Sequence, residues 1–462
     1  MKNKDTLSIF LALCVLFFAI PGVAVNQKFI TVSDIHFDPF LGCNKGPIPC
    51  PLIQELQAAP TDCWKAIFQK HNLSTTSPYG KDTTYFLLDS ITQELKHLQP
   101  EHPSFVIVLG DILAHHFDDK YKAYADAAGA GYEDFVYKTV DFVGRELQSA
   151  LPTIPIYPVI GNNDSSAGNY DIVPHDAFLS HMADTFSHNI QDATFRDTFS
   201  NAGFYAVPLS SEQRLIVLNS VFFSSLRPEN PNTDTAALSE LSWLKNQLIF
   251  AHQHNQSVLI AMHIPIGMDI FRTTTLLYLS QDPNFWKKNY TQSFLTILQQ
   301  SPAPITGLLA SHTHKDMFQI IKKIPVILTP SISPIYNNNP GFKMITLSDG
   351  EGLTDIDTYF YPIDQEPQAE WQKEYNFNAT YQPDCQSCHI IEGLQRITPA
   401  NPIYYNAYKK YVFTSHASET FSAEQWKANA CSITHFDYAS YQACFSPSHS
   451  GNALDSLKNI FK

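Results

Sequence analysis

The stretch Lys28-Phe29-Ile30-Thr31-Val32-Ser33-Asp34-Ile35-His36 joins an apolar run of strand length to two side chains of the kind that bind metals. Four later apolar runs end in the same way. They are Ser104–Leu109 before Asp111, Pro155–Ile160 before Asn162 and Asp164, Ser257–Met262 before His263, and Pro304–Ala310 before His312 and His314. Runs that are mostly β-branched or aliphatic are typical of buried strands. Because ligands at the carboxyl ends of strands in one sheet converge on one crevice, we expect about seven Asp, Asn and His side chains to meet in space.

Helical patterns separate these strands. Apolar residues recur at helical spacing in 86–98, 133–147 and 238–250. Strand–helix alternation favours an α/β layer fold. Further strands are predicted at Val326–Leu328, Phe342–Leu347 and Thr358–Tyr361. We therefore expect a catalytic domain over residues 25–364, followed by a mainly helical, cysteine-containing C-terminal subdomain over residues 365–462.

The composition limits the class of protein and of partner. The chain has 462 residues, of which 44% are hydrophobic and 13% aromatic, so it can bury a large core and disorder is not expected. The net charge of -14, with no basic run to offset it, argues against a nucleic-acid polymer as partner.

The first 24 residues are typical of an export signal. Lys2 and Lys4 supply the positive start, Leu7 to Ile20 is apolar, and Gly22 and Ala24 are spaced for cleavage after Ala24. The alternative is a retained membrane anchor, but the apolar stretch is short for a bilayer. We therefore expect a secreted protein, in an extracellular, periplasmic or lysosomal-type compartment, with no transmembrane segment after signal removal.

Export permits disulfides, and the cysteines form two clusters. In the second cluster, Cys385 with Cys388 and Cys431 with Cys444 are plausible local pairs. A zinc ribbon is the competing interpretation of the first of these pairs, but no second CxxC exists. In the first cluster, which contains Cys43, Cys50 and Cys63, one cysteine is left over unless it pairs between chains.

The residue types of the five motifs indicate two metal ions. Carboxylate, imidazole and Asn carbonyl together suit borderline divalent metals such as Zn²⁺, Fe²⁺ or Mn²⁺. One tetrahedral catalytic ion takes three protein ligands, so about seven ligands suit two ions with one bridging Asp. Two ions about 3.5–4 Å apart can hold a bridging hydroxide and clamp a phosphate for in-line attack.

The ordered set of motifs resembles a known family. The set comprises Asp34-x-His36, Gly110-Asp111, Gly161-Asn162-x-Asp164, His263 and His312-x-His314. It is similar to the calcineurin-like metallophosphoesterases and, more finely, to the acid sphingomyelinase-like phosphodiesterases. Supporting features are His115, His263-Ile264-Pro265, Asn339-Pro340-Gly341-Phe342 and the tail from Cys431 to Cys444.

The resemblance implies a four-layer αββα metallophosphoesterase sandwich and two divalent ions, with Zn²⁺ the expected metal. It implies that Asp34, His36 and His314 hold the first ion. It implies that Asn162, His263 and His312 hold the second ion, and that Asp111 bridges the two.

Asn163 departs from the family pattern. The family usually has His at this position, where it contacts the phosphate and helps to stabilise the leaving group. Asn can donate a hydrogen bond but cannot deliver a proton. Either His115 does this work, or the leaving groups are already good, or activity is low. The alternative for His115 is a structural role behind the ligands.

These observations predict an exported di-metal phosphodiesterase that hydrolyses phosphodiester or pyrophosphate bonds of nucleotide-type or phosphocholine-type substrates. The alternative enzyme is a sphingomyelin phosphodiesterase. Asp34 lies ten residues after the expected cleavage site, which leaves no room for a saposin-type domain and favours small soluble substrates. Peripheral lipid contact stays open, and we expect a monomer. A binding protein with a degenerate site is the remaining alternative, suggested by Asn163.

Overall fold

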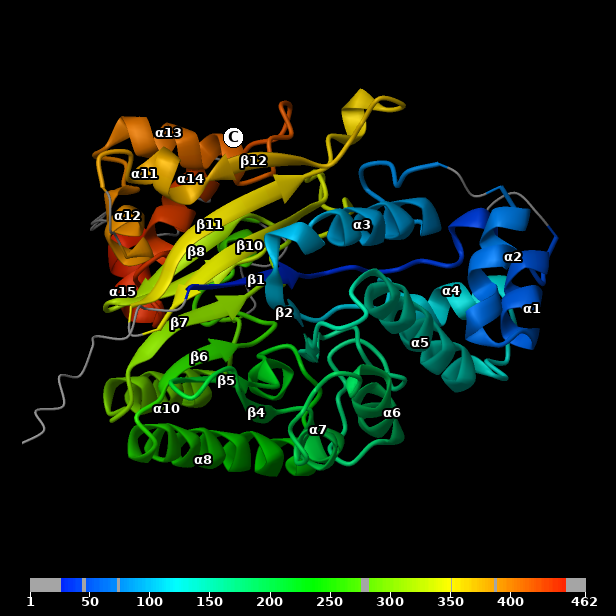
Figure 1. Ribbon diagram of the computed structural model, residues 1–462, viewed down its shortest axis with the longest axis horizontal. Coiled ribbons are helices and arrows are strands. Elements are labelled where there is room, and N and C mark those ends of the chain that lie inside the picture. The colour runs from blue at the N-terminus through cyan, green and yellow to red at the C-terminus, as the bar shows by residue number, and fades with distance from the viewer. Residues whose placement is uncertain are drawn as a thin grey trace, which may run out of the picture.

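The computed structural model describes residues 26–43, 47–72, 75–275, 282–349, 351–385 and 389–445. The expected signal peptide and Cys388 lie outside these ranges. Strands and helices alternate along most of the chain, as predicted, and the strands form two six-stranded sheets (Figure 1).

The first sheet places three of the five predicted ligand strands side by side. Its order is β12-β11-β10-β1-β2-β3; β1, β2 and β3 run parallel, whereas β10, β11 and β12 pair antiparallel. The bounds are β1 Asn26–Val32, β2 Pro103–Val108, β3 Ile156–Pro158, β10 Gly341–Ser348, β11 Gly352–Phe360 and β12 Gln372–Asn376.

The second sheet contains the other two ligand strands, β6 and β7, as parallel neighbours. Its order is β4-β5-β6-β7-β9-β8, and only β4 and β8 pair antiparallel with their neighbours. The bounds are β4 Tyr205–Pro208, β5 Gln213–Val217, β6 Ser257–Ala261, β7 Ile305–Ala310, β8 Met317–Ile321 and β9 Ile324–Leu328.

The two sheets pack against each other. Thr31 Oγ1 on β1 lies 2.8 Å from Thr329 Oγ1, directly after β9. Gly307 on β7 leaves room for Leu353 on β11, because a Cβ at 307 would lie 2.5 Å from Leu353 Cδ1. The prediction that the ligand strands share one sheet is therefore wrong: their side chains come from two sheets whose strand ends meet at one side of the sandwich.

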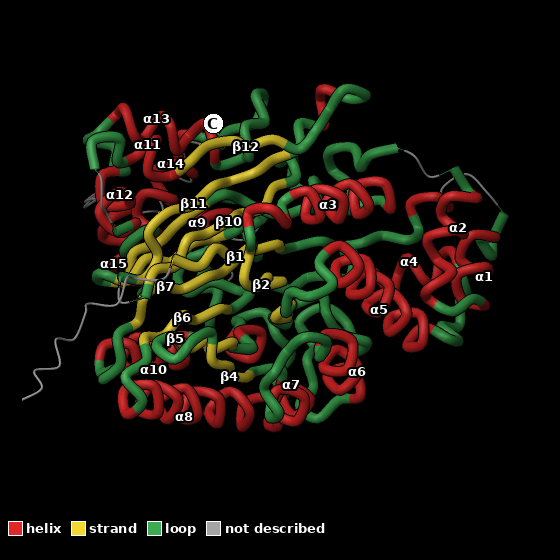
Figure 2. Tube along the Cα trace, viewed as in Figure 1, coloured by secondary structure: helices red, strands yellow, loops and turns green. Residues whose placement is uncertain are grey.

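Helices lie outside the two sheets (Figure 2). In the second sheet α8 packs on β5 and β6, and in the first sheet α6 packs on β3. The helices before residue 300 are α1 Pro51–Ala58, α2 Trp64–Lys70, α3 Tyr85–His97, α4 Phe117–Tyr124, α5 Tyr132–Ala150, α6 Ala177–Phe186, α7 Phe195–Ala202, α8 Pro231–Gln253, α9 Ile270–Thr274 and α10 Lys288–Gln299. The α/β layer fold agrees with the prediction.

The C-terminal segment is mainly helical, but it also completes the first sheet. Its helices are α11 Phe377–Tyr381, α12 Ile390–Arg396, α13 Pro402–Tyr411, α14 Ala423–Ser432 and α15 Tyr438–Phe445. We expected a mainly helical subdomain over residues 365–462, whereas β12 lies at 372–376 and pairs with β11. α11 and α12 both contact β11, so these helices lie against the first sheet (Figure 1).

Two disulfides agree with a chain that folds in an oxidising compartment. Cys43 pairs with Cys50, and Cys431 pairs with Cys444 as predicted. Cys63 is the left-over cysteine of the first cluster and is exposed as a free thiol. Cys385 is also disulfide-bonded, while its predicted partner lies outside the described residues.

Candidate metal centre

Asp111 lies between two groups of histidines. Its Oδ2 is 3.4 Å from His36 Nε2, which follows β1, and 3.3 Å from His263 Nε2, which follows β6. Asp111 itself follows β2 and is buried. A carboxylate oxygen at this point faces both groups at once, which is the geometry of a bridging ligand.

The first group joins Asp34, His36 and His314. His314 Nε2 lies 3.4 Å from Asp34 Oδ1 and 3.2 Å from His36 Nε2. All three side chains are buried. They arise from the ends of β1 and β7, so this group exists only when the two sheets pack together.

The second group joins Asn162, His263 and His312. His263 Nε2 lies 3.0 Å from Asn162 Oδ1 and 3.3 Å from His312 Nδ1. Asn162 Nδ2 donates to Asn169 Oδ1 over 2.8 Å, which turns the carbonyl oxygen of the Asn162 side chain toward His263. All seven side chains that the sequence motifs predicted therefore meet in one place.

Backbone carbonyls fix how two of these imidazoles face. His36 Nδ1 lies 2.9 Å from the Leu113 carbonyl oxygen, and His263 Nδ1 lies 2.7 Å from that of Leu109. A carbonyl oxygen can only accept, so each Nδ1 carries a hydrogen and each Nε2 faces the centre. Carbonyl partners of this kind hold metal-binding histidines in the correct tautomer.

The donor set fits divalent cations. Carboxylate oxygens, an amide oxygen and imidazole nitrogens crowd within hydrogen-bond distance of one another, so positive charge must lie between them. Groups of these side chains offer ligand atoms that all lie within 4.8 Å of one another. Asp34 Oδ1 is buried and makes no hydrogen bond within the described residues. The nitrogen and oxygen ligands, without sulfur, suit Zn²⁺, Fe²⁺ or Mn²⁺.

The electrostatics of the site point the same way. Burial lowers the pKa of His36 and of His263, but the neighbouring carboxylates, of Asp34 for His36 and of Asp111 for His263, outweigh it and raise each pKa to about 9. Burial and the neighbouring His263 lower the pKa of His312 to about 3. The neighbouring carboxylates thus favour positive charge on the His36 and His263 rings, as they would favour a cation at this centre.

The backbone is strained at the ligand positions. Asp34, His36, Asp111, His312 and His314 all have positive φ, between 44° and 68°. Non-glycine residues seldom adopt this conformation, and such residues cluster at functional sites. β1, β2 and β7 are therefore followed by sharp turns that aim these polar side chains at the centre.

Gly161 and Asp164 explain the rest of the Gly161-Asn162-Asn163-Asp164 motif. A Cβ on Gly161 would lie 2.2 Å from Asp111 Oδ1, so only glycine fits there. Asp164 is buried, and its carboxylate accepts hydrogen bonds from the backbone N–H groups of Gly161, Asp111, Ile112 and Leu113. Asp164 therefore positions the Asp111 turn and does not face the centre.

His115 lies beside the first group. Its ring stacks on that of His36, with centroids 3.9 Å apart. Its Nδ1 lies 2.9 Å from Asp82 Oδ1, and Asp82 also accepts from Lys120 Nζ over 2.9 Å. Asp82 lies in a loop with no motif around it, so no local pattern marks this contact. Nδ1 binds Asp82, and the other nitrogen, His115 Nε2, lies 3.5 Å from the Tyr336 hydroxyl.

Asn163 faces the carboxylate of Asp111. Its backbone N–H donates to Asp111 Oδ1 and its side-chain Nδ2 donates to Asp111 Oδ2, both over 2.8 Å. The side chain is buried. This residue, which we considered as a catalytic group, thus holds the candidate bridging ligand.

Two tyrosines beside the centre were not predicted. Tyr336 has its ring edge-on to His314 at 4.7 Å and to His115 at 5.7 Å, and 52% of the residue is exposed. The Tyr170 hydroxyl lies 3.4 Å from His312 Nε2. Both lie in loops without hydrophobic periodicity, so only the folded structure reveals them.

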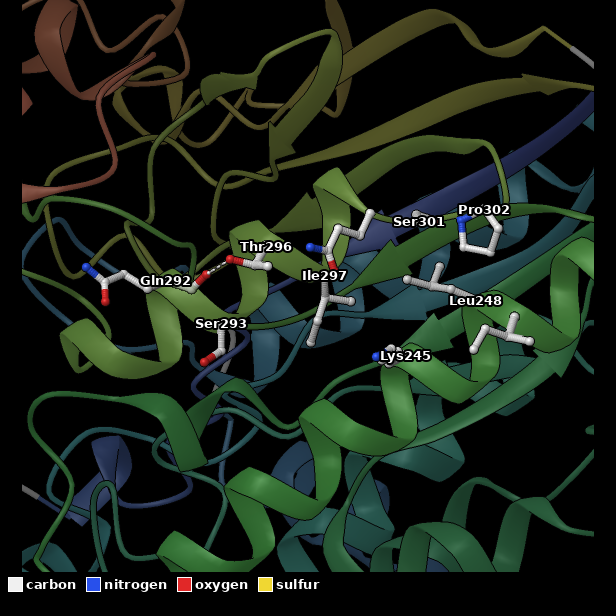
Figure 3. Close-up of a pocket in the computed structure, with 10 residues that line it drawn as sticks. Lys245, Leu248, Gln292, Ser293, Thr296, Ile297, Ser301 and Pro302 are labelled. Atoms are coloured by element: carbon white, nitrogen blue, oxygen red, sulfur yellow. Dashed lines mark hydrogen bonds between the residues drawn. The ribbon is translucent and has the colours of Figure 1, made fainter.

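A surface hollow of about 530 Å³ lies between α8 and α10, away from this centre (Figure 3). Its lining comprises Lys245, Leu248, Ile249, Gln292, Ser293, Thr296, Ile297, Gln300, Ser301 and Pro302. No carboxylate or histidine is among these side chains, so the hollow does not supply hydrolytic chemistry.

Among the helices of the described ranges, none combines the length and the apolar character that a membrane crossing needs.

Comparison with known proteins places the chain among phosphoesterases. A sequence model described as calcineurin-like phosphoesterase matches residues 27–316. Sphingomyelinase phosphodiesterase D of Dictyostelium discoideum is 26% identical over 447 residues, covering 91% of this chain and 95% of the relative. Cyclic GMP-AMP phosphodiesterase SMPDL3A of Homo sapiens is 24% identical over 397 residues, covering 81% of this chain and 83% of the relative. A dimetal phosphatase structure from Danio rerio is 12% identical with a TM-score of 0.44, covering 75% of this chain and 98% of that one.

Proposed function

Because the chain belongs to the calcineurin-like phosphoesterase family and is a metal-dependent phosphoric ester hydrolase, we propose that it is a di-metal phosphodiesterase of nucleotide-type or phosphocholine-type substrates. The observation that carries this proposal is the position of Asp111 Oδ2 between His36 Nε2 and His263 Nε2. That arrangement joins two ligand groups into one centre.

In this proposal Asp34, His36 and His314 hold one ion, while Asn162, His263 and His312 hold the other. Asp111 bridges them. When bound, two divalent ions supply the Lewis acidity and the water activation that phosphate ester hydrolysis needs. The strained turns at the strand ends keep the ligands in place before the ions bind.

His115 is the proposed proton carrier of the protein. Asp82 accepts from Nδ1, so His115 exchanges protons with substrate at Nε2. Burial and the neighbouring His36 lower the pKa of His115, and Asp82, which also accepts from Lys120, partly offsets this by stabilising the charged imidazolium. Asn163 transfers no proton in this scheme, because a side-chain amide can donate a hydrogen bond but cannot deliver a proton.

The substrate class is inferred from the surroundings of the centre. The half-exposed ring of Tyr336 beside His115 and His314 offers a face on which a base can stack or a quaternary ammonium can lie. The names of two relatives, a cyclic GMP-AMP phosphodiesterase and a sphingomyelinase phosphodiesterase, agree with these two headgroup types.

Sphingomyelin is the second candidate substrate, favoured by the relative that covers 91% of this chain. Hydrolysis of CDP-choline and cyclic dinucleotides, compared with hydrolysis of sphingomyelin in vesicles, separates the two. Faster turnover of the soluble substrates supports our proposal, whereas a preference for vesicles supports the lipid.

We also propose that the protein is exported and that it is a monomer. The pairs Cys43–Cys50 and Cys431–Cys444 support an oxidising compartment. Expression with residues 1–24 intact, followed by N-terminal sequencing of protein from the medium, tests export: a mature end at Val25 supports it.

The decisive experiment measures metal content and turnover together. We expect about two ions per chain and hydrolysis of a nitrophenyl phosphodiester. The matched variant is Asp111→Asn, which keeps the shape of the side chain and removes the bridging charge. A wild-type protein that binds two ions but hydrolyses no phosphodiester would instead be a binding protein with a degenerate site.

A further inference from the structure

Tyr170 has an unusual backbone conformation directly beside the second ligand group. Its φ is +62°, which bulky residues rarely adopt. The Tyr170 N–H donates to the Asn162 carbonyl oxygen over 2.7 Å, and Ser165 Oγ donates to the Asp171 carbonyl oxygen over 2.6 Å. These bonds close the 162–171 loop and compel the strained turn. Strain that the surroundings enforce in this way is typical of functional positions.

The turn carries the phenol to the edge of His312. Tyr170 Oη lies 3.4 Å from His312 Nε2, and the two rings meet edge to face. The other nitrogen, His312 Nδ1, faces His263 Nε2 at 3.3 Å and belongs to the group that also contains Asp111. Nδ1 is therefore the nitrogen that would bind a cation at this centre, and Nε2 would then carry the hydrogen.

This assignment settles the direction of the hydrogen bond. If Nδ1 binds a cation, His312 Nε2–H donates and Tyr170 Oη accepts. The phenol therefore keeps its own hydrogen for another acceptor. Within the described residues, no acceptor for that hydrogen is found at hydrogen-bond distance other than His312. The Tyr170 hydroxyl is thus available as a hydrogen-bond donor at the edge of the centre.

The Asn163 side chain directs one of its two Nδ2 hydrogens to Asp111 Oδ2. We propose that the Tyr170 hydroxyl donates a hydrogen bond to a phosphoryl oxygen of the substrate bound at this centre. This inference rests on the proposed function and deepens it by assigning a further substrate-binding residue, in a loop that no sequence motif marks.

Tyr170→Phe tests the proposal with inorganic phosphate as the probe. The substitution keeps the ring against His312 and removes only the hydroxyl. In protein loaded with two ions, we expect phosphate to bind about 10- to 100-fold more weakly, as for a lost hydrogen bond to a charged group. kcat/KM for phosphodiesters should fall by a similar factor, while the metal content stays at the wild-type value.

Tyr438→Phe, which alters an exposed tyrosine of α15, is the matched control and should change neither quantity. Unchanged phosphate affinity in Tyr170→Phe at full metal content would overturn the proposal. A loss of bound metal that accounts for the whole effect would also overturn it, because Tyr170 would then only support His312. Failure of the proposed function is distinct: the wild-type protein would hydrolyse no phosphodiester, whereas the phosphate-binding comparison would still report on Tyr170.

Discussion

The side-chain amide of Asn163 donates to Asp111 Oδ2 over 2.8 Å, at the oxygen that also faces His36 and His263. The residue that departs from the family pattern is therefore bound to the candidate bridging ligand. An amide there orients the carboxylate but leaves the proton transfer to another group. This relationship explains how the ligand geometry persists although a family histidine is absent.

Asp111→Ala should abolish turnover and lower the metal content below about two ions per chain, because the carboxylate faces both ligand groups. The measurement is elemental analysis after dialysis together with a phosphodiester assay. Asp119→Ala, at an exposed position of α4, is the control and should behave like wild type. Full activity with two bound ions in Asp111→Ala would remove this residue from the bridging role.

Gly161→Ala should disable the centre without abolishing the fold. A Cβ at this position would lie 2.1 Å from the Asp111 backbone nitrogen, so the Asp111 turn must move. We expect loss of metal and of turnover, measured as in the previous case. Gly129→Ala is the control: nothing lies within 4 Å of its Cβ, and its positive φ costs only about 1–2 kcal/mol of local backbone energy. Equal activity of the two variants would contradict the steric argument.

The sequence predicted the site better than it predicted the sheets. Asp34, Asp111 and His263 could be placed at strand ends because buried parallel strands are continuous apolar runs. Their division between two sheets could not be predicted from the strand patterns, since periodicity along one strand carries no information about which strand pairs with it. Only the family resemblance implied a sandwich of two sheets, which the structure contains.

Other features were missed for related reasons. β12 comprises Gln372–Asn376, which is mostly polar and nowhere fully buried, and it is held by backbone pairing to β11. An edge strand needs no hydrophobic pattern. Asp82 and Tyr170 lie in loops and reach the centre through tertiary contacts, so no local signal marks them.

Glu240→Gln should stabilise the protein at neutral and higher pH. Glu240 is fully buried on α8; its Oε1 accepts from the Asn219 N–H over 2.7 Å, and burial raises its pKa well above the usual value. The unfolded chain loses this proton near pH 4–5, whereas the folded chain keeps it to higher pH. Above the unfolded pKa the folded state binds more protons, so stability falls as pH rises, by up to about 1.4 kcal/mol per pH unit.

Gln keeps the accepting oxygen and carries no titrating proton. In the Glu240→Gln variant the free energy of unfolding should therefore lack the fall with rising pH that Glu240 causes. Chemical denaturation at several pH values between 5 and 8 measures the difference, with Glu212→Gln at an exposed position as the control. Parallel stability curves for wild type and Glu240→Gln would show that Glu240 is ionised in the folded protein.

The last prediction concerns the proton that a poor leaving group needs. Help from a general acid grows with the basicity of the leaving group, so His115→Ala should slow alkyl phosphodiesters more than nitrophenyl ones, by about 10²–10⁴-fold for the most basic leaving groups. Asn163→His should show the opposite pattern and speed alkyl esters, provided that the new ring still leaves Asp111 in place. The measurement is kcat/KM for each variant over a series of leaving groups at fixed pH and metal content.

Asp82→Asn provides a matched comparison, because it removes the charge behind His115 and leaves the ring present. This variant should give a weaker version of the His115→Ala pattern. A His115→Ala loss that is equal for all leaving groups would assign His115 to support of His36, on which its ring stacks, and would exclude it as the proton donor.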